Sequence, residues 1–173
     1  MKKTFMALTI ASLFMAGAAQ AQDHSTTVDI NGQINGDHTE CSVFTSKSTI
    51  TLSGLVADLP KQGEHATTPV VLDYNIMSNS AESCIGKVAV VLHGEADNAD
   101  GTTLANSDTS PEAAKGIGIG LFDKNLAPIT INSNQITTNT NTGQIYLQAV
   151  KLNGQDALEG TVHGSLTLDI VRL

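Results

Sequence analysis

Two segments near opposite ends of the chain alternate apolar and polar residues in the way that is typical of half-buried β-strands. In the first, one face carries Thr26, Val28, Ile30, Gly32 and Ile34. In the second, residues 161–172, one face carries Val162, Gly164, Leu166, Leu168 and Ile170. Successive side chains of a strand point to opposite sides of the sheet, so each segment presents one apolar face and one polar face. A chain with such ends is expected to be built from β-sheets.

Similar runs, rich in Thr, Val and Ile and separated by Gly, Asn, Asp and Ser, recur along the rest of the chain. We predict strands at residues 26–34, 48–52, 69–76, 87–94, 116–123, 129–132, 144–152 and 161–172. Two polar stretches, 95–111 and 133–143, are predicted to be surface loops, the second a long hairpin connection. Several short strands joined by turns favour an all-β antiparallel sandwich in a single domain.

The first 21 residues have the features of a secretory signal peptide. Lys2 and Lys3 supply positive charge, residues 5–19 are almost wholly apolar, and Ala19-Gln20-Ala21 fits a cleavage site. Cleavage there leaves 152 residues and removes two of nine basic residues but none of the 17 acidic ones, so the mature formal charge is −10. That sign disfavours nucleic acid and anionic lipid as partners.

Export places Cys41 and Cys84 in an oxidising compartment, where a disulfide forms readily if the geometry permits it. They are the two cysteines of the chain, 43 positions apart. We therefore predict one disulfide between them. The alternative, two buried free thiols, is disfavoured in that compartment.

Several motifs together resemble the type 1 pilin family of chaperone-usher fimbriae. Residues 27–34 (TVDINGQI) are similar to the family's N-terminal donor segment, and Cys41-Ser42-Val43 follows it as the first cysteine does in the family. Cys84 precedes a strand at residues 88–94, and residues 114–123 (AKGIGIGLFD) are similar to the family's glycine-rich strand. The terminal run begins at Gly160, 13 residues before the end, as in the family. Two departures are Arg172 in place of a penultimate tyrosine and two extra residues between Gly32 and Cys41.

The resemblance implies an incomplete immunoglobulin-like β-sandwich that is completed by a strand donated from a neighbouring subunit. It divides the chain into a signal peptide (1–21), a donor extension (22–34) and a pilin domain (35–173). The donor strand would carry Thr26, Val28, Ile30, Gly32 and Ile34. The acceptor groove and the chaperone-contacting terminal strand would carry Gly160, Val162, Gly164, Leu166, Leu168 and Ile170. From alternation alone, residues 26–34 would instead be the first strand of a complete sandwich.

The resemblance also implies a function and partners. The chain would be a structural subunit that polymerises with other pilin subunits by donor-strand exchange to support bacterial adhesion. A periplasmic chaperone and an outer-membrane usher would handle it on its way through the periplasm to a surface fimbrium. No cofactor, catalytic residue or metal site is expected.

Two other functions remain open. A single-domain adhesive subunit of the same fibre would bind a host receptor through loops such as residues 95–111. A periplasmic Cu/Zn superoxide dismutase-like enzyme would also be an exported sandwich with one disulfide. Its metal ligands would have to come from five scattered histidines that form no His-x-His pair, namely His24, His38, His65, His93 and His163. We expect these histidines to be surface or loop residues.

Gly116, Gly118 and Gly120 form a G-x-G-x-G pattern with no helical pattern after it. A phosphate-binding loop would require a following helix, so we expect a close-packed or bulged strand here.

Overall fold

The computed structural model describes residue 31, residues 39–137 and residues 139–173. These residues form two antiparallel β-sheets and one short 3-10 helix. No helix in the described part of the chain is long and apolar enough to cross a membrane. The predicted signal peptide, and all but one residue of the predicted donor extension, lie outside the described residues.

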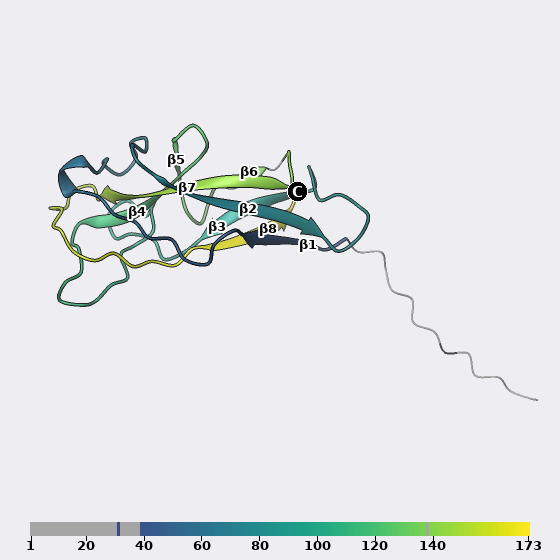
Figure 1. The fold of residues 1–173 in the computed structure, drawn as a ribbon, viewed down its shortest axis with the longest axis horizontal. Coiled ribbons are helices and arrows are strands. Elements are labelled where there is room, and N and C mark those ends of the chain that lie inside the picture. Colours follow the sequence, from purple (N-terminus) through teal and green to yellow (C-terminus); the bar gives the residue numbers. More distant parts are fainter. Residues whose placement is uncertain (1–30, 32–38, 138) are drawn as a thin grey trace, which may run out of the picture. The chain divides into compact units, whose positions relative to one another are not determined.

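The larger sheet has five strands in the order β1-β2-β7-β4-β5, and the smaller sheet has three in the order β6-β3-β8 (Figure 1). In the larger sheet the strands are β1 (Cys41–Thr45), β2 (Val70–Ser78), β7 (Thr142–Lys151), β4 (Ile117–Phe122) and β5 (Pro128–Ile129). In the smaller sheet they are β6 (Gln135–Thr137), β3 (Val88–His93) and β8 (Thr167–Arg172). The helix η1 (Val56–Asp58) lies in the long connection between β1 and β2.

The register of each strand follows its pattern of apolar residues. Along β2, Leu72, Tyr74 and Ile76 are buried while the residues between them are exposed, so this strand has one face toward the core. Its partner β7 places Ile145 opposite Leu72, and Ile145 is fully buried. A slip of one residue would turn every core side chain outward, which is why this pattern specifies the pairing.

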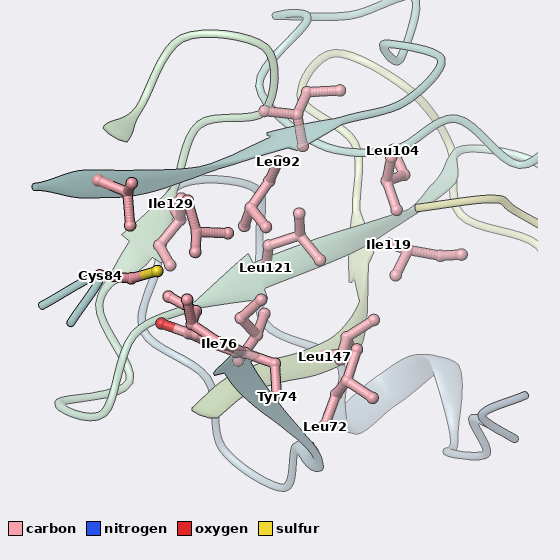
Figure 2. Close-up of a cluster of buried hydrophobic side chains, with 14 residues drawn as sticks. Leu72, Tyr74, Ile76, Cys84, Leu92, Leu104, Ile119, Leu121, Ile129 and Leu147 are labelled. Atoms are coloured by element: carbon pink, nitrogen blue, oxygen red, sulfur yellow. The ribbon is translucent and has the colours of Figure 1, made fainter. Parts of the chain in front are cut away.

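The core fills the space between the two sheets. Figure 2 shows side chains of both sheets gathered around a common space, namely Leu72, Tyr74 and Ile76 from β2, Ile119 and Leu121 from β4, Leu147 from β7 and Leu92 from β3. Val88, Val90 and Leu92 of β3 are at most 1% exposed. Burying an aliphatic side chain of this size stabilises a fold by about 1.5 to 3 kcal/mol, so this cluster is the main source of cohesion.

Four of the eight predicted strands are confirmed, with shifts at their ends, and the prediction 26–34 lies outside the described residues apart from residue 31. The predictions 69–76, 87–94, 116–123 and 144–152 correspond to β2, β3, β4 and β7. The prediction 129–132 retains only Ile129, as part of β5, because the chain turns at Ile131 and Asn132. Asn132 has a φ of 60°, a left-handed conformation that asparagine tolerates and that ends a strand.

Three predictions of local structure are wrong. Residues 48–52 form no strand, whereas Cys41–Thr45, for which the pattern predicts none, forms β1. The stretch 133–143, expected to be a loop, contains β6, which pairs with β3 through Ile136 and Val90. The terminal strand is expected at 161–172, and only its second half, Thr167–Arg172, forms regular pairs.

The loop 95–111 is built around one buried carboxylate. Asp97 is 6% exposed and accepts hydrogen bonds from the backbone N–H groups of Ala99 and Thr103, at 2.8 and 2.9 Å. It also accepts one from the side chain of Gln62 at 2.9 Å. Burial alone would raise the pKa of Asp97, but these hydrogen bonds together hold it below its ordinary value. The charged carboxylate therefore ties the loop to the sandwich.

Candidate functional site

A groove opens into the core between the free edges of the two sheets. One wall is residues 45–52, which continue from β1, and the other is residues 162–168, which lead into β8. The buried side chains of Leu72, Leu104, Ile119 and Leu147 form its floor. Its volume is about 410 Å³. A space of this size and apolar floor suits a run of aliphatic side chains.

The groove exists because two edge strands approach without pairing. In the described part of the chain β1 pairs only with β2, and β8 pairs only with β3. Figure 1 shows β1 and β8 side by side, and some of their Cα atoms lie within 8 Å of each other. Away from this approach the sandwich is open along residues 162–168. An unpaired strand edge offers N–H and C=O groups to any extended chain.

The terminal segment has the two faces that its sequence predicts. Val162, Gly164, Leu166, Leu168 and Ile170 are half-buried, whereas the residues between them from Thr161 to Asp169 are exposed. The four aliphatic members of this row pack against the main core. Although only the second half pairs with β3, the whole segment keeps the alternation of a strand. One row therefore lines the groove along its length.

Gly160 starts this segment where the chain passes close to another backbone. A Cβ atom at this position would overlap the carbonyl oxygen of Glu112 and the amide nitrogen of Ala114. Gly164 has a different environment, because a Cβ there would lie 2.8 Å from Cδ1 of Ile119 on the groove floor. Backbone can approach closely at both points only because the residue is glycine.

A second hollow continues the groove beyond Leu52 and Val162, which line both. It has a volume of about 460 Å³, and its apolar lining includes Leu59, Ala114 and Ile117. Leu55 and Leu158 stand at this hollow with 70% and 54% of their surface exposed. The apolar surface available to a ligand is therefore longer than the groove alone.

The disulfide predicted from the sequence is present, with Cys41 and Cys84 joined and their Cα atoms 6.1 Å apart. Cys41 begins β1 and Cys84 lies just before β3, so the bond connects the two sheets. Cys84 is 2% exposed and belongs to the main core. The base of β1 is fixed covalently at this end.

The residues around the start of β1 are also tied by hydrogen bonds. The hydroxyl of Thr39 donates to Glu82 at 3.1 Å, and the carboxylate of Glu82 pairs with Lys87 at 3.0 Å. Hydrogen bonds from Lys87 and Thr39 and the charge of Lys87 hold the pKa of Glu82 below its ordinary value. The carbonyl of Thr39 accepts a hydrogen bond from Arg172.

The structure brings together the predicted acceptor residues but leaves the predicted donor residues undescribed. Val162, Gly164, Leu166 and Leu168 line the groove, and Gly160 lines the hollow that continues it. Ile170 lies outside both openings and packs against the main core. Thr26, Val28, Ile30, Gly32 and Ile34 lie outside the described residues. The opposite wall, residues 45–52, was not predicted to be part of the site. The half-buried Ile50 and Leu52, which alternate with polar neighbours, were the available signal.

The three histidines that the structure describes lie at the surface, as expected. His65 and His163 are exposed, and His93 lies 3.6 Å from Asp169 at the surface. His24 and His38 lie outside the described residues. Within the described ranges, no three residues among His, Cys, Asp and Glu gather closely enough to hold a metal ion.

The glycine-rich strand is close-packed, as predicted. A Cβ at Gly118 would lie 2.7 Å from Oγ1 of Thr103, and one at Gly120 would lie 2.8 Å from Cγ1 of Val150. Both glycines belong to β4, in the larger sheet between β7 and β5. Because glycine has no side chain, the side chains of Thr103 and Val150 can lie directly against the backbone of β4.

Comparisons with known proteins agree with this geometry. No family model matches the chain. Long polar fimbria protein A of Salmonella typhimurium is 26% identical over 152 residues, covering 85% of this chain and 82% of that protein. The crystal structure of the P pilus rod subunit PapA has a similar fold, with a TM-score of 0.54 at 15% identity, covering 85% of this chain and 100% of PapA. The chain is therefore similar in sequence to a fimbrial protein, and its two-sheet fold is similar to that of a pilus rod subunit.

Proposed function

We propose that the chain is a structural subunit of a surface fimbria that polymerises by donor-strand exchange. Residues 26–34 of one subunit would enter the groove of the next and lie along the row from Val162 to Ile170. The observation that carries this proposal is that row, half-buried on a terminal segment whose second edge is free and which lies beside an open groove. Such an edge is the usual site of strand addition.

The added strand would contribute both backbone and side-chain interactions. Its N–H and C=O groups would pair with the free edge of the terminal segment, and Val28, Ile30 and Ile34 would enter the groove. Burying each of these side chains is worth about 1.5 to 3 kcal/mol before the cost of ordering the segment is subtracted. Gly32, without a side chain, would lie where the groove is shallowest.

The exposed edge also accounts for the other proposed partners. An open core with an unpaired strand is prone to aggregation, so a subunit needs a temporary cover before it assembles. We assign that role to a periplasmic chaperone that contacts the terminal strand, with an outer-membrane usher as the site of assembly. The similarity of the chain to a fimbrial protein and its predicted signal peptide support this route to the cell surface.

The direct test is a charge placed on the apolar face of the donor segment. Ile30→Asp should abolish fibre formation, because a carboxylate would have to be buried in the groove. Asn31→Asp adds the same charge to the opposite face and should leave fibres of normal length. Fibres are counted and measured by electron microscopy, and circular dichroism of the refolded chain checks that both variants fold. Fibres of normal length from Ile30→Asp would refute the donor assignment.

A further inference from the structure

The first half of the terminal segment is extended although no strand pairs with it. Residues 162–166 form no regular ladder in the described structure, and β8 begins only at Thr167. An isolated strand with Gly160 at its start and Gly164 within it has many accessible conformations, because glycine restrains the backbone least. Something else must hold this part of the segment straight.

Residues 106–112, which we call the splint loop, make those contacts. The side chain of Asn106 donates hydrogen bonds through Nδ2 to the carbonyls of Ala114 and Thr161, both at 3.0 Å. Its Oδ1 accepts a hydrogen bond from the amide of His163 at 2.9 Å. One half-buried amide therefore bonds to two alternate residues of the terminal segment.

The backbone of the splint loop adds further bonds to the same two residues. The amide of Ser107 donates to the carbonyl of His163 at 2.8 Å, and the amide of Thr161 donates to the carbonyl of Glu112 at 2.8 Å. The hydroxyl of Thr161 donates to the carboxylate of Asp108. Hydrogen bonds from Thr161 and Ser110 hold the pKa of Asp108 below its ordinary value, so it is an acceptor at neutral pH.

These bonds occupy one edge of the segment and leave the other edge to the groove. In an extended chain the backbone groups of alternate residues point to opposite edges, so those of Thr161 and His163 face the splint loop. The carbonyl oxygen of Ser165 points toward this same edge, because a Cβ atom added to Gly94 would lie 2.8 Å from it. Gly94 directly follows β3, so β3 and the splint loop contact the same edge of the terminal segment, β3 along its second half and the loop along its first half. The backbone groups of Val162, Gly164 and Leu166 face the groove.

We propose that the splint loop preforms the acceptor for strand addition, with Asn106 as the positioning residue. This inference rests on the proposed function and adds how the groove is prepared. With Thr161 and His163 already fixed, an incoming strand meets an ordered edge and does not have to order it during binding. Ordering the backbone of even one residue corresponds to roughly a tenfold change in an equilibrium constant, so the effect on binding is measurable.

The test compares Asn106→Ala with Asn139→Ala in the refolded full mature chain at low concentration. Asn139 is an exposed asparagine for which no side-chain hydrogen bond is found among the described residues. The probe is a fluorescent peptide of residues 22–34. For Asn106→Ala we expect affinity to fall roughly tenfold, mainly through slower association, with faster hydrogen exchange at the amides of Thr161 and His163. Asn139→Ala should match the wild-type chain.

Two further variants separate positioning from a general loss of stability. Asn106→Asp keeps the acceptor for His163 but places a carboxylate oxygen against the carbonyls of Ala114 and Thr161, so it should slow association at least as much as Asn106→Ala. If Asn106→Ala does not refold, Asp108→Ala removes a single acceptor and should slow association about threefold. A merely structural role would lower the unfolding temperature and leave the association rate unchanged. The inference is overturned if an alanine variant that folds has the association rate and the hydrogen exchange of the wild type. A peptide that fails to bind the wild-type chain would instead count against the proposed function.

Discussion

The guanidinium group of Arg172, the penultimate residue, donates a hydrogen bond to the backbone carbonyl of Thr39, 133 positions earlier in the chain. Thr39 is buried and lies two residues before Cys41, at the base of β1. The end of β8 is thereby attached to the residues that precede β1. In the resembling family a tyrosine stands at this position, and a phenol would offer one donor where the guanidinium offers five.

Arg172→Ala should therefore destabilise the folded chain. A hydrogen bond from a charged donor contributes more than a neutral one, but Arg172 is exposed, so we expect a loss of about 1 kcal/mol in the free energy of unfolding. Urea denaturation of the refolded chain measures it. Lys124→Ala, which removes an exposed cation from the turn after β4, should have no effect. Equal stability of Arg172→Ala and wild type would show that the contact does not contribute.

Loss of the disulfide should have a larger effect. The bond between Cys41 and Cys84 closes a loop with a sequence separation of 43. Its removal should lower the free energy of unfolding by about 2 to 5 kcal/mol, because the unfolded chain gains freedom. The double variant Cys41→Ala, Cys84→Ala and the reduced wild-type chain should give the same urea midpoint. A wild-type chain whose midpoint does not move on reduction would contradict this expectation.

Asp97 should make stability depend on acidity. Its pKa is below the ordinary value of 3.8 in the folded chain, so its contribution is present above about pH 3.8 and is lost as the pH falls through the lower, folded value. Asp97→Asn places an amide donor against Gln62 and Thr103, which are donors themselves, and should destabilise the chain by about 1 to 3 kcal/mol at pH 7. Thermal unfolding between about pH 7 and pH 2.5 should show the two chains converging at the acid end. A difference in unfolding temperature that is the same at every pH would show that the charge of Asp97 does not contribute to stability.

Gly164→Val should fill the groove without preventing folding. The new Cβ would press on Cδ1 of Ile119, the end of a flexible side chain that can shift. The rest of the valine side chain would occupy space that the incoming strand needs, so the yield of fibres should fall at least tenfold. Thr167→Val, at an exposed position that does not line the groove, is the matched control and should assemble normally. Normal assembly by both variants would place the added strand elsewhere.

The layered fold and one wall of the groove could be predicted from the sequence because both depend on short-range alternation. The buried and exposed positions of β2 and of the terminal segment follow directly from their residues. The shared family pattern also pointed to the pairing of Cys41 with Cys84.

The remaining features depend on contacts between distant segments, which alternation cannot reveal. Residues 48–52 have the pattern of a strand, yet they lie along the groove without a strand to pair with, so they stay irregular. Cys41–Thr45 forms β1 because β2 offers it an edge, with Val43 opposite Ile76. The splint loop has the composition of an ordinary polar loop, since nothing local shows that Asn106 bonds to residues 55 and 57 positions away.

The position of the disulfide has a mechanical consequence for a subunit within a fibre. In the proposed fibre the donor segment precedes the domain, so tension between subunits would enter near Thr39 and reach Cys41 almost at once. The covalent bond passes that load across to Cys84, next to β3, and the ladder between β3 and β8 carries it to the groove edge. The pairing of β1 with β2 is thereby relieved of much of the pull. The shortest load path through the domain would then consist of one covalent bond and one strand pair, and the strand pairs of the larger sheet would carry little of the force.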